Sequence, residues 1–351
     1  MSVVSATGGP IDVGLRDQRL AVDASARGDA GAVESAARTP APAERRNNCL
    51  FEEPWWLDAV APGTWDAVEI QDGGQVQARL TFGVGRLLGR TALRQPPLTQ
   101  TLGPWYHDTQ GKSATRLARE KDLAQQLIAK LPPHGFFSIN FHRSVSNWLP
   151  YHWAGFQAAP RITYVLTLGG GEQPLWAGLQ ENIRREIRKA RKQVEVLTTD
   201  DVDLFLDLNR KTFERQALDL PHSPHIVRAL DVACARRQAR RIYLARDGHG
   251  RLHAGLYVVH DDRCCYYLMG GGDPALRNSG AGSLLMWQAI TDASSTSREF
   301  DFEGSMGEPI ERFFRSFGAA QTTFFNLRRS DRLVGAVEGL RTAWRSLARR
   351  A

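Results

Sequence analysis

The sequence has few cysteines and no long apolar run. Its 351 residues include only four cysteines, Cys49, Cys234, Cys264 and Cys265, and none has the C-x-x-C spacing of a redox or zinc motif. We therefore expect neither a disulfide framework nor a metal site, and a reducing cytoplasm fits best. No apolar stretch approaches the roughly 18 residues of a transmembrane helix. The first residues also lack the basic and apolar regions of a secretory signal, so we expect a cytoplasmic protein without a transmembrane segment.

Charged residues are abundant but unevenly distributed. The chain holds 45 Lys and Arg against 38 Asp and Glu, a net charge of +7. Residues 180–192 carry six basic side chains against two glutamates, and residues 326–351 carry seven arginines against two acidic residues. Such clusters indicate an anionic partner, namely RNA, a phosphorylated ligand or an acidic membrane, or else a solvated arginine-rich surface.

Length and composition predict two domains with additional segments at the ends. At about 100–200 residues per domain, 351 residues suffice for two. Residues 1–46 are rich in Ala, Gly, Ser and Arg without apolar periodicity, which predicts a disordered leader. We assign residues 47–171 to a first α/β unit that ends in a glycine linker, and residues 172–330 to a second. Residues 331–351 are expected to form a basic amphipathic tail helix.

Hydrophobic periodicity predicts the elements of both units. In the first unit we expect a hairpin over 66–83, a helix over 116–131 and strands over 136–141 and 161–168. The second unit opens on a helix whose apolar stripe runs from Leu179 to Val194, followed by helices over 201–215 and up to about 237. A three-strand meander over 241–270 comes next. Then follow a helix over 282–293, a strand over 299–303, a helix over 310–316 and a strand over 321–328.

A glycine-rich turn follows the meander. Residues 277–282 fit the pattern R-x-x-G-x-G and open the next predicted helix. Glycines allow a ligand to approach the backbone, and free N–H groups at a helix start favour a pyrophosphate. We therefore predict a donor-binding turn made of Arg277, Ser279, Gly280, Ala281 and Gly282.

The order of these elements, together with several short motifs, resembles the FemAB-like GNAT acyltransferases. The order meander, R-x-x-G-x-G, helix, strand, helix, strand is that of a GNAT domain. The similar strings are PWWL (54–57), LGPW (102–105), RITY (161–164), NIRREIRKA (182–190), RQ (215–216), FDFEGS (300–305) and FFRSFG (313–318). They cover residues 50–328 in order.

The resemblance implies an α/β (α+β) fold of two tandem GNAT-like domains, each with a mixed, mostly antiparallel sheet flanked by helices. It also implies transfer of an acyl group to an amine, such as a small molecule or peptide, held between the domains. The donor would be an acyl-CoA thioester or an aminoacyl-tRNA. A basic residue before the closing F-G is typical of the family, which here is Arg315. Because arginine stays protonated at neutral pH, we expect it to stabilise charge on a phosphate or an oxyanion.

Two carboxylates are candidates for the base that deprotonates the amine. In residues 300–303, aromatic and acidic side chains alternate, so Asp301 and Glu303 share one face of the predicted strand. Either could bind the ammonium group and take its proton, and Glu303 is slightly favoured. The alternative for Asp301 is a structural role, capping the next turn or pairing with an arginine.

Further candidates could contact the acceptor or a phosphate. His142 ends a predicted strand and could accept a proton across the cleft, although a hydrogen-bonded rim residue is the simpler interpretation. Arg184, Arg188 and Lys189 lie on the basic face of the helix that opens the second unit, and Arg215 ends the next helix. No i, i+4 carboxylates compensate this face, which favours contact with tRNA or another phosphate over internal ion pairs.

The sequence thus predicts an N-acyltransferase that moves an acetyl or aminoacyl group to an amine by direct attack. The alternative is a catalytically decayed GNAT-fold protein that binds an anionic ligand, phosphorylated or RNA. The sequence leaves the acceptor, the donor and the oligomeric state open.

Overall fold

A computed structural model describes residues 46–108, 111–216, 218–304 and 306–337. Nearly all of the predicted leader and residues 338–351 of the predicted tail helix lie outside this range. Residues 332–337 are helical, and Val334 is buried against Leu87 and Ala92.

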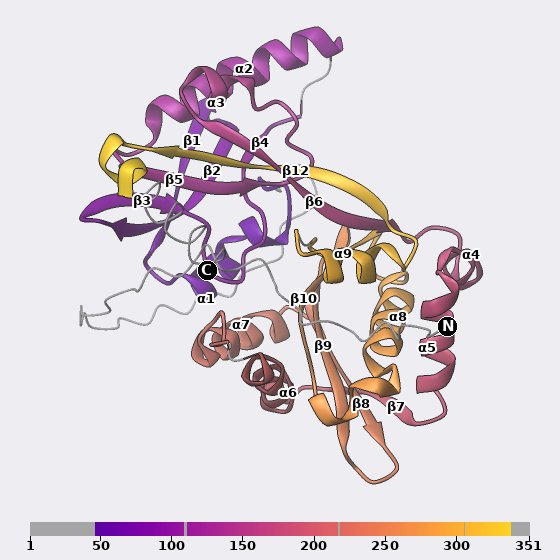
Figure 1. The fold of residues 1–351 in the computed structure, drawn as a ribbon. Helices are drawn as coiled ribbons and strands as arrows, with labels where there is room; N and C mark the ends of the chain where they lie inside the picture. Colours follow the sequence, from indigo (N-terminus) through magenta and orange to yellow (C-terminus); the bar gives the residue numbers. More distant parts are fainter. Residues whose placement is uncertain (1–45, 109–110, 217, 305, 338–351) are drawn as a thin grey trace, which may run out of the picture.

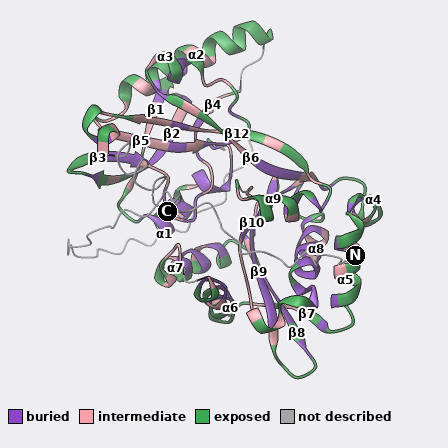
Figure 2. Cartoon of the chain, viewed as in Figure 1, coloured by how far each residue is buried: buried purple, intermediate pink, exposed green. Residues whose placement is uncertain are grey.

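The first half of the described chain supplies six strands of a sheet, three α-helices and a short 3-10 helix (Figure 1). Its elements are η3 (Leu50–Glu52), α1 (Pro54–Val60), β1 (Trp65–Asp72), β2 (Gln75–Leu87), β3 (Arg90–Arg94), β4 (Pro104–Tyr106), α2 (Ser113–Lys130), β5 (Phe136–Phe141), α3 (Leu149–Trp153) and β6 (Gln157–Thr167). The predicted hairpin is confirmed, because β1 and β2 pair antiparallel. Helix α2 is mostly exposed and buries only Leu123, Ala124 and Leu127 against the sheet (Figure 2).

The second half alternates helices with a four-strand meander. Its elements are α4 (Glu172–Gly178), α5 (Glu181–Ala190), β7 (Val194–Thr199), α6 (Val202–Arg215), α7 (Pro224–Ala235), β8 (Arg240–Asp247), β9 (Leu252–His260), β10 (Cys264–Gly272), η4 (Pro274–Ser279), α8 (Ala281–Ala293), β11 (Glu299–Asp301), α9 (Glu308–Arg315) and β12 (Ala320–Ser330). The predicted helix stripe is wrong at its end: α5 stops at Ala190, and Val194 begins strand β7.

The twelve strands of the described residues form one sheet. The order is β1-β2-β3-β5-β12-β6-β11-β10-β9-β8-β7, and β4 pairs with β2. Only β3 with β5 and β10 with β11 are parallel, so the sheet is mostly antiparallel as predicted. Strand β12, from the end of the second predicted unit, lies between β5 and β6 of the first. The boundary predicted at residues 171/172 therefore divides strands of one continuous sheet.

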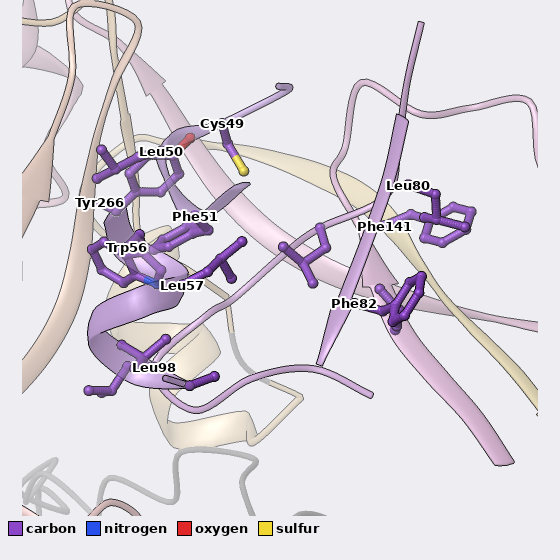
Figure 3. Close-up of a cluster of buried hydrophobic side chains, with 14 of the residues drawn as sticks. Cys49, Leu50, Phe51, Trp56, Leu57, Leu80, Phe82, Leu98, Phe141 and Tyr266 are labelled. Carbon is purple, nitrogen blue, oxygen red and sulfur yellow. The ribbon is translucent and has the colours of Figure 1, made fainter. Parts of the chain in front are cut away.

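Two hydrophobic cores hold the helices to this sheet. On one side, α6 and α7 cover β8–β10; on the other, α8 packs on β8 and β9, and α5 packs on α8 (Figure 1). The first core also joins the two halves of the chain. Phe51 of η3 lies against Tyr266 of β10 (Figure 3), and their ring centroids are 4.7 Å apart. Burial of such rings removes 150–250 Å² each from water, so this contact helps fix the halves together.

Candidate active site

The parallel strands β10 and β11 separate after a short common ladder. Residues 264–266 of β10 pair with 299–301 of β11, where β11 ends. Strand β10 continues to Gly272, with a bulge between Tyr267 and Met269. A cavity of ≈ 430 Å³ opens at the point of separation, between these strands, α6, α9 and the sheet of the first half. Volumes of 300–1,000 Å³ are typical of small-molecule sites.

Glu303 lies at this point of separation, where the chain leaves β11. Its backbone is left-handed, with φ +57°, and so is that of Gly304, with φ +55°. A Cβ at residue 304 would overlap the carbonyl oxygen of Ile162, so this position requires glycine. A non-glycine residue in this conformation is uncommon and is often found at functional sites. The turn thus directs the Glu303 side chain to the lining of the cavity.

The Glu303 carboxyl group lacks a full set of partners. Its Oε1 atom is buried and has no hydrogen-bond partner in the described part of the chain. Burial, followed by the nearby Asp301, raises the pKa of Glu303 well above its ordinary value, and a hydrogen bond with the Gln100 side chain only partly offsets this. A buried carboxyl group with a raised pKa is a stronger base when ionised, and such groups often occur at active sites.

Asp301 has structural partners instead, which corrects its prediction as a candidate base. Its Oδ1 accepts hydrogen bonds from the Thr163 hydroxyl and from the Glu303 backbone N–H, at 2.5 and 2.8 Å. Its Oδ2 lies 3.5 Å from Nε of Arg143. The pKa of Asp301 is raised by burial, which Thr163 and Arg143 counteract. Both alternatives foreseen for Asp301, the turn cap and the arginine pair, are present, and they position Glu303.

His142 is buried behind Glu303 and is unsuited to accept a proton at neutral pH. It lines a second cavity of ≈ 20 Å³ together with Asp301 and Glu303, large enough for about one water molecule. Its Nδ1 lies 2.8 Å from the Ser144 hydroxyl. Burial, aided by the charge of Arg143, lowers the pKa of His142 to about 3, so the ring is neutral across the physiological range.

Arg315 lies away from Glu303. It sits at the end of α9, half-exposed, with Nε 2.8 Å from Oε1 of Glu311, which also accepts a hydrogen bond from the Tyr164 hydroxyl. Arg315 is absent from the described lining of both cavities. The three residues predicted to act together therefore do not converge, because the helix that carries Arg315 turns it toward Glu311.

The glycine turn is packed against helix α5. As predicted, Gly280 begins α8 with a left-handed φ of +79°. A Cβ on it would lie 2.5 Å from the carbonyl oxygen of Glu186 and 2.8 Å from its carboxylate. The ammonium group of Lys189 bonds the carbonyl oxygen of Asn278. Of the predicted donor residues, Ser279 and Ala281 are buried, whereas Arg277 and Gly282 are exposed. None of them is among the described residues that line either cavity.

The basic face of α5 is partly neutralised by its own helix, which corrects the expectation of uncompensated charge. Glu181 lies 3.0 Å from Nε of Arg184 and 3.1 Å from Nη1 of Arg188. The i, i+4 spacing does not indicate these ion pairs, because Glu181 lies three residues before Arg184 and seven before Arg188. Arg215 is exposed at the end of α6 and does not line the cavity.

Several residues of the cavity and its surroundings were not predicted from the sequence. Arg94, Arg161 and Arg328 line the cavity from the sheet of the first half, and Arg143 and Thr163 support Asp301. Residues 90–94 were not predicted as a strand, so nothing marked Arg94. The alternating polar residues Ser138 and Asn140 in a predicted strand were an available signal for a polar sheet face.

Two searches of the described residues gave negative results. No group of three or more His, Cys, Asp or Glu side chains in that part of the chain could hold a metal ion. Within the same residues, no helix combines the length and apolarity that a membrane crossing requires.

Comparisons with known proteins connect this fold to acyl transfer. Residues 178–315 match the acetyltransferase (GNAT) domain family. The crystal structure of FemX is similar with a TM-score of 0.60 at 13% identity, covering 81% of this chain and 93% of FemX. A conserved protein of unknown function from Bacteroides thetaiotaomicron has a TM-score of 0.51 at 13% identity, covering 82% of this chain and 93% of that one. No curated protein matches the sequence. The predicted GNAT-like fold is confirmed, because residues 178–315 match the GNAT acetyltransferase domain and the FemX structure shares the fold of most of the chain.

Proposed function

We propose that the chain is an N-acyltransferase whose acceptor amine binds in the ≈ 430 Å³ cavity, with Glu303 as its base. One observation carries the proposal: the buried Oε1 of Glu303 has no hydrogen-bond partner among the described residues. An unpaired buried acceptor costs about 1–3 kcal/mol. An ammonium group would remove this cost, because it supplies both a hydrogen-bond donor and a compensating charge.

The chemistry follows from this placement. Glu303 takes a proton from the bound ammonium group, and the amine nitrogen attacks the carbonyl carbon of the donor. A C–N bond forms, and the C–S bond of a thioester or the C–O bond of an ester breaks, so that the leaving thiol or hydroxyl takes up a proton. Binding of the cation lowers the raised pKa of Glu303 and so favours the ionised carboxylate, which is the form that acts as a base.

Backbone groups on β10 are suited to polarise the donor carbonyl. The ladder between β10 and β11 ends at Tyr266, so beyond it this edge of β10 has no partner strand among the described residues. N–H groups aimed at a developing oxyanion typically contribute about 3 kcal/mol to catalysis. Arg315 has no part in this step, because it pairs with Glu311 outside the described lining of the cavity.

The donor that we favour is an aminoacyl-tRNA rather than an acyl-CoA. A CoA pyrophosphate would need the turn 277–282, where the carboxylate of Glu186 approaches Gly280. A carboxylate at a helix start opposes a bound phosphate. The exposed face of α5, with Arg188 and the neighbouring Arg185, could instead contact the phosphate backbone of an RNA.

A donor competition tests this function. Purified protein is incubated with a mixture of amines and either labelled acetyl-CoA or labelled aminoacyl-tRNAs, with and without ribonuclease. We expect ribonuclease-sensitive labelling of the amine fraction from tRNA. Transfer from acetyl-CoA that ribonuclease leaves unchanged would refute the favoured donor, and no transfer from either would contradict the enzyme proposal. A cytoplasmic location, where aminoacyl-tRNA is available, fits four buried free thiols.

A further inference from the structure

One wall of the ≈ 430 Å³ cavity is a sheet face that carries arginines. Strands β3, β5 and β12 are neighbours, and their registers place Arg94 beside Ser138 and Ser138 beside Arg328. Paired residues on adjacent strands project from the same face of a sheet, about 4.8 Å apart. All three line the cavity. The row therefore sets two guanidinium-bearing side chains on either side of a hydroxyl group.

A third arginine extends this wall along the same face. Arg161 of β6 pairs with Phe324 of β12, and both line the cavity. We call Arg94, Ser138, Arg161 and Arg328 the arginine wall. Asn326 joins it to the rest of the face, donating from Nδ2 to Oδ1 of Asn140 at 2.9 Å.

Two arginines of the wall, Arg94 and Arg161, have no carboxylate partner among the described residues that line the cavity. Glu303 is the only acidic side chain among the described lining residues. Arg94 and Arg161 form no ion pair in the described part of the chain, and burial without a carboxylate nearby lowers the pKa of Arg94. The Arg94 guanidinium lies over Gly85, where a Cβ would be only 2.8 Å from Nη2. Partly buried cations without counterions are unfavourable unless a ligand supplies the opposite charge.

We propose that the arginine wall binds an oxyanion, a carboxylate or a phosphate, that belongs to the acceptor. The acceptor is then an amine that carries an acidic group, with its ammonium at Glu303 and its oxyanion at Arg94 and Arg161. This inference rests on the proposed function for the position of the amine. A zwitterionic acceptor compensates Glu303 as well as Arg94 and Arg161 in one cavity, whereas an anionic donor would leave Glu303 without a cation.

Calorimetry on the full chain tests the inference with three primary amines: propylamine, β-alanine and 3-aminopropyl phosphate. We expect the two charged amines to bind at least about tenfold more tightly than propylamine, since charge-assisted hydrogen bonds are the strong ones. The tighter of the two identifies the oxyanion as carboxylate or phosphate. Arg94→Ala and Arg161→Ala should each weaken that binding about tenfold, and Arg94→Lys should weaken it less. Arg90→Ala removes the same charge from the exposed part of β3 and should change nothing.

Equal affinity for all three amines would overturn the inference. Thermal melting first shows that Arg94→Lys and Arg161→Ala are folded. The inference would also be refuted if these folded variants bind the charged amines as tightly as the original chain does. A rise in the KM of the donor, instead of the KM of the acceptor, would refute it as well. The two proposals fail separately. If the amines with an oxyanion bind more tightly but no donor gives transfer, the anion-binding role of the arginine wall is supported and the N-acyltransferase proposal is refuted. If propylamine and the charged amines are all acylated equally fast, the N-acyltransferase proposal is supported and the anion-binding role is refuted.

Discussion

Replacing Glu303 with glutamine removes the base while keeping the shape of the side chain. The amide has no negative charge to bind an ammonium group and cannot take its proton at neutral pH. Loss of a positioned general base typically lowers kcat roughly 10²–10⁴-fold. We expect a loss of this size in Glu303→Gln, together with weaker binding of the acceptor amine and unchanged donor binding.

The same substitution should stabilise the fold at high pH. The pKa of Glu303 is raised in the folded protein above its ordinary value of 4.5. The native state then holds its proton longer than the unfolded state, so stability is greatest below pH 4.5 and is lost as pH rises toward the folded pKa. The slope in that window is up to ~1.4 kcal/mol per pH unit. Glutamine does not ionise, so the variant escapes this loss.

Two assays check this prediction. Initial rates with saturating donor report kcat, and urea unfolding at pH 5 and pH 8 reports stability. We expect Glu303→Gln to be more stable than the original chain at pH 8 by about 1 kcal/mol or more, with a smaller difference at pH 5. Glu308→Gln, on an exposed glutamate of α9, is the matched control and should alter neither quantity. Full activity of Glu303→Gln, or lower stability at pH 8, would refute the reasoning.

Three further substitutions probe the surroundings of the site. Gly280→Ala should lower the free energy of unfolding by about 1–3 kcal/mol, because its φ is +79° and the new Cβ would press on α5. Arg143→Met should lower the free energy of unfolding, measured in urea, by about 3 kcal/mol, because it leaves the buried Asp301 without its cation. Removal of Arg143 also raises the folded pKa of Asp301 further, so this loss of stability should grow as pH rises. Arg188→Gln should reduce the salt dependence of tRNA binding, measured by fluorescence anisotropy, by about 0.7–0.9 in the slope of log K against log salt.

Each of these variants has a matched control. Gly282→Ala adds a methyl group with no atom within 4 Å, so a cost equal to that of Gly280→Ala would contradict the packing argument. Arg210→Met breaks only half-exposed ion pairs and should cost less than about 1 kcal/mol; if Arg143→Met costs no more, the buried network is not stabilising. Arg246 of β8 pairs with Glu195 of β7 and is not part of α5, so Arg246→Gln should leave the slope of log K against log salt unchanged. An equal fall in both slopes would remove α5 from the RNA interface.

Local patterns were sufficient to predict most elements. Alternation predicted the hairpin β1–β2 and the meander β8–β10, and an apolar stripe predicted α5. The glycine that begins α8 was also predicted, because a left-handed residue at a helix start favours glycine. These signals depend on neighbours a few residues apart. They failed where such neighbours do not decide the outcome, as at Val194, which continues the stripe of α5 but lies in β7.

The chemical roles depended on contacts over long sequence separations. Asp301 and Glu303 look equivalent in the sequence, yet Asp301 is the one that accepts a hydrogen bond from Thr163 and lies within ion-pair distance of Arg143, both more than a hundred residues earlier. Likewise, residues 277–282 match the R-x-x-G-x-G pattern of a phosphate-binding turn, but this pattern does not indicate that Glu186 packs against Gly280. No periodicity reports such pairs, because each is fixed by how complete strands and helices pack.

By itself, the sequence determined the kind of protein: its helices and strands, the GNAT-like order of these elements and Glu303 as a candidate base. Only the tertiary structure decided which groups meet. Strand β12 lies between β5 and β6, and its register brings Arg328 beside Ser138, which pairs with Arg94, in the lining of the cavity that Glu303 also lines. The physical reason is that backbone preference and amphipathicity act between near neighbours, whereas strand order and register minimise the exposed apolar surface of the whole sheet.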